Sequence, residues 1–294
     1  MELRSLEYFL AIAREGNITA AANTLHVSQP ALSRQVMELE DEFGKQLIIR
    51  KSRGISLTED GQLLRKRAEE IAELVKKTRD ELSGSSEYLT GDIYIGAGEA
   101  ESIHYLTETA QRLKADNPEL KFHIYSGNTS DVMERLNKGL IDFALIVSMQ
   151  ELDVKKYDSI SLPGRELWGV LMPNQHPLAS KAFVTAEDIR KEPLIVSNEI
   201  YQSRTLSVLT ESPREELNIS ATYSLLYNAS ILVRDGMGIA IGLDRIINTS
   251  GDCSLSFRPL HPAQTVGMSI VWKRSQVFST AAAAYLEELK KHLN

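Results

Sequence analysis

The chain has 294 residues, a formal net charge of −7 and a hydrophobic fraction of 43%, values ordinary for a globular protein of about two domains. The acidic balance argues against binding nucleic acid over the whole surface, although it permits a local basic patch. The single cysteine, Cys253, excludes an internal disulfide and a multi-cysteine metal site. The six histidines show no metal-ligand spacing.

The first residues do not have the pattern of an export signal. Glu2 and Glu7 stand where a signal peptide has a basic region followed by an apolar run. The longest apolar runs are the size of a strand, far short of the ~20 residues of a membrane span. We therefore expect a cytoplasmic protein with no membrane partner.

Residues 1–58 are predicted to form three short helices and a hairpin. Seven basic and seven acidic groups balance in this region, so the excess negative charge lies further along the chain. Asn17 or Thr19 is expected to cap the second helix. Ser28 is expected to cap a third helix that ends at Gly44. The first helix is indicated by apolar residues spaced three and four apart, at Leu3, Leu6, Phe9, Leu10 and Ala13.

The third helix has the polar first turn that a DNA-reading helix needs. Gln29 and Ser33 are four apart and share a face, Gln29 can pair with adenine, and Arg34 can bind guanine with two hydrogen bonds. Two predicted strands, 46–50 and 54–57, would carry a basic tip suited to a phosphate backbone or minor groove. The expected DNA contacts are Thr19, Ser28, Gln29, Pro30, Ser33, Arg34, Arg50, Lys51 and Arg53. The alternative is a solvated surface helix, which the preceding alanine-rich helix and the basic hairpin disfavour.

Residues 58–88 are predicted to form one long helix, with Thr58 as a cap and Gly61 as a weak spot in its first turn. Apolar residues repeat every seven positions along it, which is typical of a dimerisation seam. The expected seam residues are Leu64, Ala68, Ile71, Val75, Thr78 and Leu82. The alternative is a helix that packs on its own domain. The run Ser83-Gly84-Ser85-Ser86 is expected to be a linker.

Residues 91–294 alternate between strand and helix patterns, which predicts parallel sheets with helices on both faces. The expected strands are 92–96, 121–125, 143–147, 167–172, 194–196, 239–242 and 267–272. The expected helices include one ending at Lys114, one over 130–138 and one from Ser279.

The chain carries no pattern of a catalytic site, such as a phosphate-binding glycine loop or a nucleophile elbow. An enzyme with a DNA-binding head is one alternative, and a solute-binding protein is another. We expect no enzymatic activity, no catalytic residue, no metal and no cofactor.

The segment Phe9–Gly61 resembles the N-terminal domain of the LysR-type transcriptional regulators. The residues that carry the likeness include Ala20-Ala21-Ala22, Val27-Ser28-Gln29-Pro30-Ala31-Leu32-Ser33-Arg34, Phe43-Gly44 and Leu57-Thr58-Glu59-Asp60-Gly61. Later landmarks similar to the family's are Gly139-Leu140-Ile141-Asp142, Met172–Ala179 and Val233–Ala240.

The resemblance implies an α/β protein with a winged helix-turn-helix, a long linker helix and a two-lobed effector domain of the periplasmic-binding-protein type. It implies a regulator that binds double-stranded DNA at a two-fold operator and responds to a small-molecule effector. The implied assembly is a homodimer through the linker helix, commonly a tetramer formed as a dimer of dimers, with RNA polymerase as a further partner. The domains would be 1–58, 59–90 and 91–294, with lobe I at 91–162 and 267–294 and lobe II at 163–266.

The effector is expected between the lobes, beyond the carboxyl ends of the strands. The candidate residues are Gly98, Ala100, Ser102, Thr129, Ser148, Gln202, Arg204 and Asn228. Thr129 could instead be a helix cap, Ser102 an early helix residue and Arg204 a surface charge. This chain departs from the family's pattern at Glu99 and Glu101, whose negative charges would repel an anionic ligand.

Overall fold

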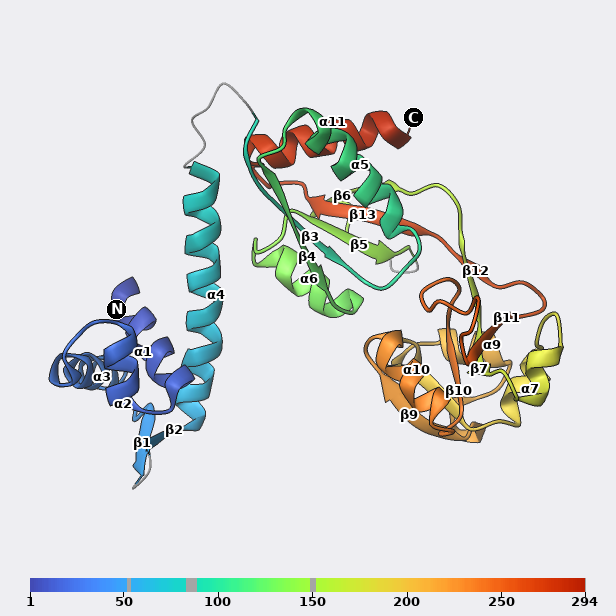
Figure 1. Cartoon of the computed structure of the whole chain (residues 1–294), viewed down its shortest axis with the longest axis horizontal. Coiled ribbons are helices and arrows are strands. Elements are labelled where there is room, and N and C mark those ends of the chain that lie inside the picture. Colours follow the sequence, from blue (N-terminus) through green and yellow to red (C-terminus); the bar gives the residue numbers. More distant parts are fainter. Residues whose placement is uncertain (52–53, 83–88, 149–151, 294) are drawn as a thin grey trace. The chain divides into compact units, whose positions relative to one another are not determined.

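The computed structural model describes residues 1–51, 54–82, 89–148 and 152–293. The chain forms two compact units, Met1–Ser83 and Gly84–Asn294 (Figure 1). The long helix belongs to the first unit, whereas the sequence set residues 59–90 apart as a segment of their own. The predicted linker at 83–86 lies outside the described residues.

The N-terminal unit consists of four helices and one hairpin. Its elements are α1 (Leu3–Glu15), α2 (Ile18–Thr24), α3 (Gln29–Phe43), β1 (Ile48–Lys51), β2 (Gly54–Leu57) and α4 (Glu59–Leu82). Phe9, Ile12, Leu32 and Leu39 form the centre of a core shared by α1, α2 and α3. Burying these side chains is what stabilises helices too short to persist alone.

Side-chain caps fix where the helices begin. The Asn17 side chain accepts hydrogen bonds from the backbone N–H groups of Thr19 (2.8 Å) and Ala20, so Asn17 is the cap of α2 and Thr19 lies in the first turn. Ser28 caps α3 as predicted, and Gly44 ends that helix in the left-handed conformation.

Gly61 is a close-approach site rather than a weak spot in α4. Thr58 Oγ1 accepts the Gly61 N–H at 2.9 Å, which caps the helix as predicted. A Cβ at Gly61 would lie 2.0 Å from the carbonyl oxygen of Leu47. The missing side chain therefore lets the start of α4 lie against the chain that enters β1.

The predicted seam of α4 divides into two parts. Ala68 is fully buried and Leu64 packs on the core of the N-terminal unit, so here the alternative of packing on the same domain holds. Ile71 and Val75 are half-buried, whereas Thr78 is exposed and Leu82 is 82% exposed. Only the second part of the seam leaves apolar surface for a partner.

The C-terminal unit contains two sheets. The first has the order β4-β3-β5-β13-β6, with strands β3 (Gly91–Ala97), β4 (Leu120–Ser126), β5 (Phe143–Val147), β6 (Tyr157–Ser161) and β13 (Met268–Lys273). Helices α5 (Ile103–Asp116) and α11 (Thr280–Leu293) pack on one face and α6 (Thr129–Asn137) on the other (Figure 1). We call this sheet with its helices lobe I.

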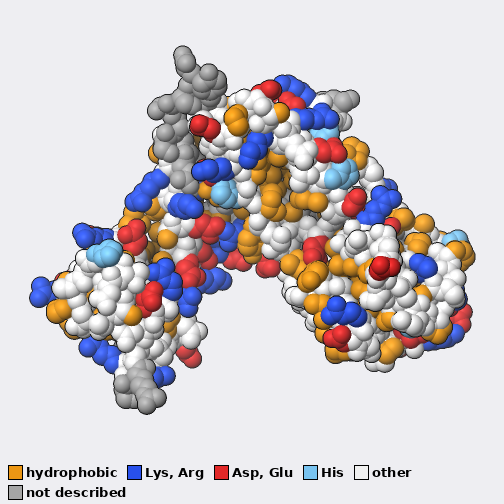
Figure 2. Space-filling view, viewed as in Figure 1, with side chains coloured by type: hydrophobic (Ala, Val, Ile, Leu, Met, Phe, Trp, Pro, Cys, Tyr) orange, Lys and Arg blue, Asp and Glu red, His pale blue; other side chains and the backbone are white. Residues whose placement is uncertain are grey.

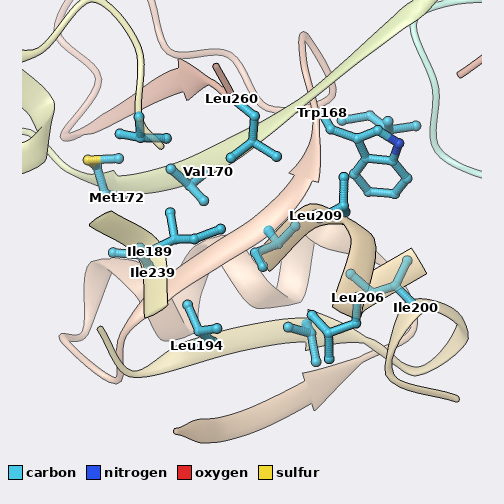
Figure 3. Close-up of a cluster of buried hydrophobic side chains, with 14 of the residues drawn as sticks. Trp168, Val170, Met172, Ile189, Leu194, Ile200, Leu206, Leu209, Ile239 and Leu260 are labelled. Carbon is cyan, nitrogen blue, oxygen red and sulfur yellow. The ribbon is translucent and has the colours of Figure 1, made fainter. Parts of the chain in front are cut away.

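The second sheet with its helices is lobe II. Its order is β11-β7-β10-β8-β9, with β12 paired to β7. The strands are β7 (Glu166–Pro173), β8 (Leu194–Ser197), β9 (Ile219–Tyr223), β10 (Ile239–Leu243), β11 (Leu255–Pro259) and β12 (Thr265–Val266). The helices are η1 (Pro177–Ser180), α7 (Ala186–Arg190), α8 (Asn198–Gln202), α9 (Thr205–Thr210), η2 (Arg214–Glu216) and α10 (Leu226–Arg234). Trp168, Val170 and Met172 of β7 enter the core cluster shown in Figure 3, while Leu171 between them packs toward α10.

The sheets are mixed rather than parallel, which corrects the prediction. β13 pairs antiparallel with β5 and β6, and β7 pairs antiparallel with β10 and β11. The expected strands all form, but the sequence did not predict β6, β9, β11 and β12. Those strands are short and mostly half-buried, so their hydrophobic patterns are weak. No helix in the described parts of the chain has the length and hydropathy to cross a membrane.

We predict that Gly61→Ala lowers the free energy of unfolding of the N-terminal unit by about 1–3 kcal/mol, because the new methyl group meets the Leu47 carbonyl. Alanine in an exposed helix is otherwise better than glycine by up to about 1 kcal/mol, so the sign is diagnostic. Both tryptophans, Trp168 and Trp272, lie in the C-terminal unit. The denaturant concentration at which the N-terminal unit unfolds, followed by far-UV circular dichroism, should fall. The unfolding midpoint followed by tryptophan fluorescence should not change.

The matched control is Gln62→Ala at the next, exposed position of α4. If Gly61→Ala unfolds at the same denaturant concentration as the control, the close approach does not constrain this helix.

Candidate functional site

The first turn of α3 presents a polar surface. Ser28, Gln29, Pro30 and Arg34 are exposed, as is Thr19 in α2. Ser33 is only 8% exposed, and its hydroxyl accepts a hydrogen bond of 2.9 Å from the Gln29 side chain. This hydrogen bond orients the Gln29 side chain, and the predicted DNA contact of Ser33 stays a prediction.

The hairpin is anchored to the helices on both sides. Glu40 of α3 accepts the backbone N–H groups of Leu47 (2.7 Å) and Ile48 (3.1 Å) with one carboxylate oxygen. On the other side, Ile55 N–H donates to the Gly16 carbonyl at the end of α1, at 2.8 Å. The base of the hairpin is therefore fixed relative to α3, as a wing must be if both are to contact one duplex.

The basic side chains of this surface are available for a ligand. Among the residues that the structure describes, Arg34, Arg50 and Lys51 form no ion pair, and all three are exposed. Arg53 lies outside the described residues. Figure 2 shows basic side chains on the visible face of the N-terminal unit, interspersed with acidic ones. Such groups bind phosphates, and Arg34 on the helix can also read base edges.

A cavity of about 250 Å³ lies between the two lobes of the C-terminal unit. The loops that follow β3, β4, β8 and β9 line it, at Gly98-Glu99, Gly127–Thr129, Ser197–Ile200 and Tyr223–Leu226. Each of these four strands pairs in parallel with a neighbour, so the cavity lies at their carboxyl ends, where α/β sheets bind ligands. Trp168, Gly242 and Met268 complete parts of its wall.

Two glutamates cross this cavity from opposite lobes. Glu99 of lobe I accepts the backbone N–H of Leu226, the first residue of α10 in lobe II. Glu199 of lobe II accepts the backbone N–H of Thr129, the first residue of α6 in lobe I, at 2.5 Å. The Thr129 hydroxyl also donates to Glu199, at 3.3 Å. Each carboxylate thus lies at the positive end of a helix on the opposite lobe.

A third glutamate joins the two lobes through hydrogen bonds. Glu166, at the start of β7, is 6% exposed and accepts hydrogen bonds from the backbone N–H (2.9 Å) and the hydroxyl of Ser102. Ser102 precedes α5, so here too a carboxylate serves the N-terminus of a helix.

The cavity is negatively charged. Its described lining contains Glu99 and Glu199 and no lysine, arginine or histidine. Burial raises the pKa of Tyr223, and the charges of Glu99 and Glu199 raise it further. The Tyr223 phenol therefore stays neutral and donates to the Ile241 carbonyl at 2.7 Å.

Two of the eight predicted effector residues, Gly98 and Thr129, line the cavity. The structure places the other six outside its lining. Ala100 and Ser102 are buried where α5 begins, and Ser148 pairs with the Ser269 hydroxyl at 2.7 Å. Gln202, Arg204 and Asn228 are exposed, with Arg204 preceding α9. Thr129 is a helix N-terminal residue and a cavity residue at once.

The sequence missed the cavity residues Trp168, Asn198, Glu199, Tyr223, Ser224 and Leu226. Asn198 and Glu199 lie only a few residues before Gln202 and Arg204, which were predicted from the sequence instead. Tyr223 and Leu226 follow β9, a strand that the sequence did not predict. Among the described residues, no group of three or more His, Cys, Asp or Glu side chains could hold a metal ion.

Comparisons with known proteins identify both units. Residues 3–62 match the model of the bacterial regulatory helix-turn-helix protein, lysR family, and residues 86–294 match the LysR substrate binding domain. The chain belongs to the LysR family. The predicted family and fold class are thereby confirmed: this is a DNA-binding transcriptional regulator with an effector-binding domain.

One of the relatives aligns over the whole chain and another over two thirds of it. The uncharacterized HTH-type transcriptional regulator YybE of Bacillus subtilis is 27% identical and aligns over 100% of both chains. The dual regulator OxyR of Escherichia coli is 28% identical over 67% of this chain and 63% of its own. The crystal structure of CbnR, a LysR family transcriptional regulator, covers 100% of both chains with a TM-score of 0.75 and 19% identity, which supports the fold.

We predict that Arg34→Ala reduces the ratio of specific to non-specific DNA binding about tenfold or more, because it removes contacts to a base. Lys51→Ala should weaken binding to all DNA sequences alike. It should also reduce the slope of the logarithm of the binding constant against the logarithm of salt concentration by about one. Gel-shift titrations at several salt concentrations measure both effects.

The matched control is Arg274→Ala in the C-terminal unit, where the guanidinium pairs with Asp158 at 2.7 Å. An unchanged specificity ratio for Arg34→Ala would remove Arg34 from the reading surface.

Proposed function

We propose that this regulator binds a two-fold DNA site as a homodimer and that a small molecule in the interlobe cavity controls its output. The observation that carries this proposal is the cavity, which lies at the carboxyl ends of parallel strands and is bridged by hydrogen bonds between lobes. A ligand in this cavity contacts both lobes, so its affinity depends on how the lobes are arranged. Such a difference in affinity is what allows a ligand to shift the protein from one arrangement to another.

The second half of α4 supports the dimer. A groove between α1 and α4 is lined by Leu3, Ile71, Val75 and other residues of the N-terminal unit. Leu74 and Leu82 of the same helix are 42% and 82% exposed. An amphipathic helix with an uncovered apolar stripe is stabilised by pairing with a second copy. We further propose that two dimers form a tetramer, and that RNA polymerase is a partner at the promoter.

The proposed function includes no catalysis and no cofactor. The cavity brings together two carboxylates, a neutral phenol and an indole. Such a lining fits reversible binding. We propose that the protein acts in the cytoplasm, where its DNA target lies.

A footprinting experiment tests this function. Full-length protein on the DNA upstream of its own gene should protect two half-sites separated by whole helical turns, about 10 base pairs each. A metabolite that binds the protein should change the protected length. Absence of specific protection, or protection that no bound metabolite alters, contradicts the proposal.

We predict that Val75→Asp combined with Leu82→Asp converts the protein to monomers, because two buried charges at each seam cannot be solvated. Sedimentation velocity measures the change. Lys66→Asp, an exposed substitution about half a turn round the helix from Val75, is the control and should leave the assembly intact. Unchanged oligomers in the double variant would refute the seam.

A further inference from the structure

We infer that the interlobe cavity binds a small organic cation, an amine protonated at neutral pH that carries an apolar group. This inference rests on the proposal that the cavity is the effector site, and it names the chemical class that the site accepts. It stands on the charge of the lining, the hydrogen bonds of the two glutamates and the aromatic walls.

The positions that an anion would use are already filled by this chain's own carboxylates. The first N–H groups of α6 and α10 point at the cavity, and helix N-termini of this kind bind carboxylate and phosphate ligands. Here Glu199 occupies the first and Glu99 the second. An anionic effector would have to displace one of these carboxylates or lie beside it.

The negative charges have no cationic partner. Among the described residues neither Glu99 nor Glu199 forms an ion pair, and the lining holds no lysine, arginine or histidine. Glu99 uses one carboxylate oxygen for Leu226, and its other oxygen accepts no hydrogen bond from the described chain. That oxygen can accept the N–H of an ammonium group, and a charge-assisted bond of this kind is about twice as strong as a neutral one.

The walls suit the rest of an organic cation. Trp168 and Tyr223 both line the cavity, and aromatic faces attract cations. Trp168 lies at one end of the lobe II core cluster, on the same side as Ile200 (Figure 3). Leu145, Val147 and Met268 add apolar surface that would cover an alkyl or aryl group.

A metal ion fits the cavity less well. The described residues contain no cluster of three metal-ligating side chains, and the lining is largely apolar. A cavity of about 250 Å³ is close to the lower end of the ~300–1,000 Å³ that ligand pockets occupy. The space therefore matches a small metabolite rather than a bare ion.

Three probes of one shape but different charge test the inference on the full-length protein. Phenethylammonium, 2-phenylethanol and 3-phenylpropionate are compared by isothermal titration calorimetry and thermal shift. We expect phenethylammonium to bind and raise the melting temperature, with the alcohol at least tenfold weaker and the acid without effect. The inference is overturned if 3-phenylpropionate binds more tightly than phenethylammonium, or if phenethylammonium does not bind at about 10 mM.

Charge-neutral variants assign the effect to the two glutamates. Glu99→Gln and Glu199→Gln keep an oxygen that can accept the helix N–H, so circular dichroism should show an unchanged fold. Each should weaken phenethylammonium about tenfold or more, while the control Glu187→Gln on the surface of α7 should not. Equal affinity in all three variants would also overturn the inference. The DNA footprint of the same samples reports separately on the proposed function, because it needs no amine.

Discussion

In the C-terminal unit, each lobe places a glutamate carboxylate at the N-terminus of a helix in the other lobe, and the contact between the lobes depends on this pair of interactions. Glu99 accepts the first N–H of α10 in lobe II, and Glu199 accepts the first N–H of α6 in lobe I. The first turn of a helix leaves backbone donors unpaired, and the helix dipole favours a negative charge there. Each lobe thus supplies a hydrogen-bond acceptor for an unpaired backbone N–H of a helix in the other lobe. The two carboxylates also give the cavity between the lobes its negative charge. We propose that an effector acts by strengthening or replacing these bonds.

The N-terminal unit depends instead on contacts of the hairpin with its helices. Glu40 holds the entry of β1 to α3, the Gly16 carbonyl accepts the N–H of Ile55 in β2, and Gly61 lets the start of α4 lie against the Leu47 carbonyl. These contacts fix the position of the hairpin relative to α3, the helix that we predict to read DNA. Exposed basic groups on this unit can bind a duplex even though the whole chain is acidic, because binding depends on the local patch.

Much of the fold could be predicted because its signals are local. The caps Asn17 and Ser28, the terminating Gly44 and the apolar spacing of α1 act within a few residues of the helices they define. The cavity depends on distant segments, and there the sequence succeeded only in part. It found Gly98 and Thr129 from strand ends, yet it missed Glu199 and Tyr223, whose positions follow from the packing of lobe II. The acids at 99 and 101 were expected to disfavour an anionic ligand, which stays a prediction; of the two, only Glu99 lines the cavity.

The most direct test of this account is a crystal structure of the full-length protein with phenethylammonium. The account predicts the ammonium nitrogen within hydrogen-bond distance of Glu99, with Glu99 still bonded to Leu226 N–H and Glu199 still bonded to Thr129 N–H. An anion bound to the N–H groups of Thr129 and Leu226, with both glutamates turned away, would contradict it.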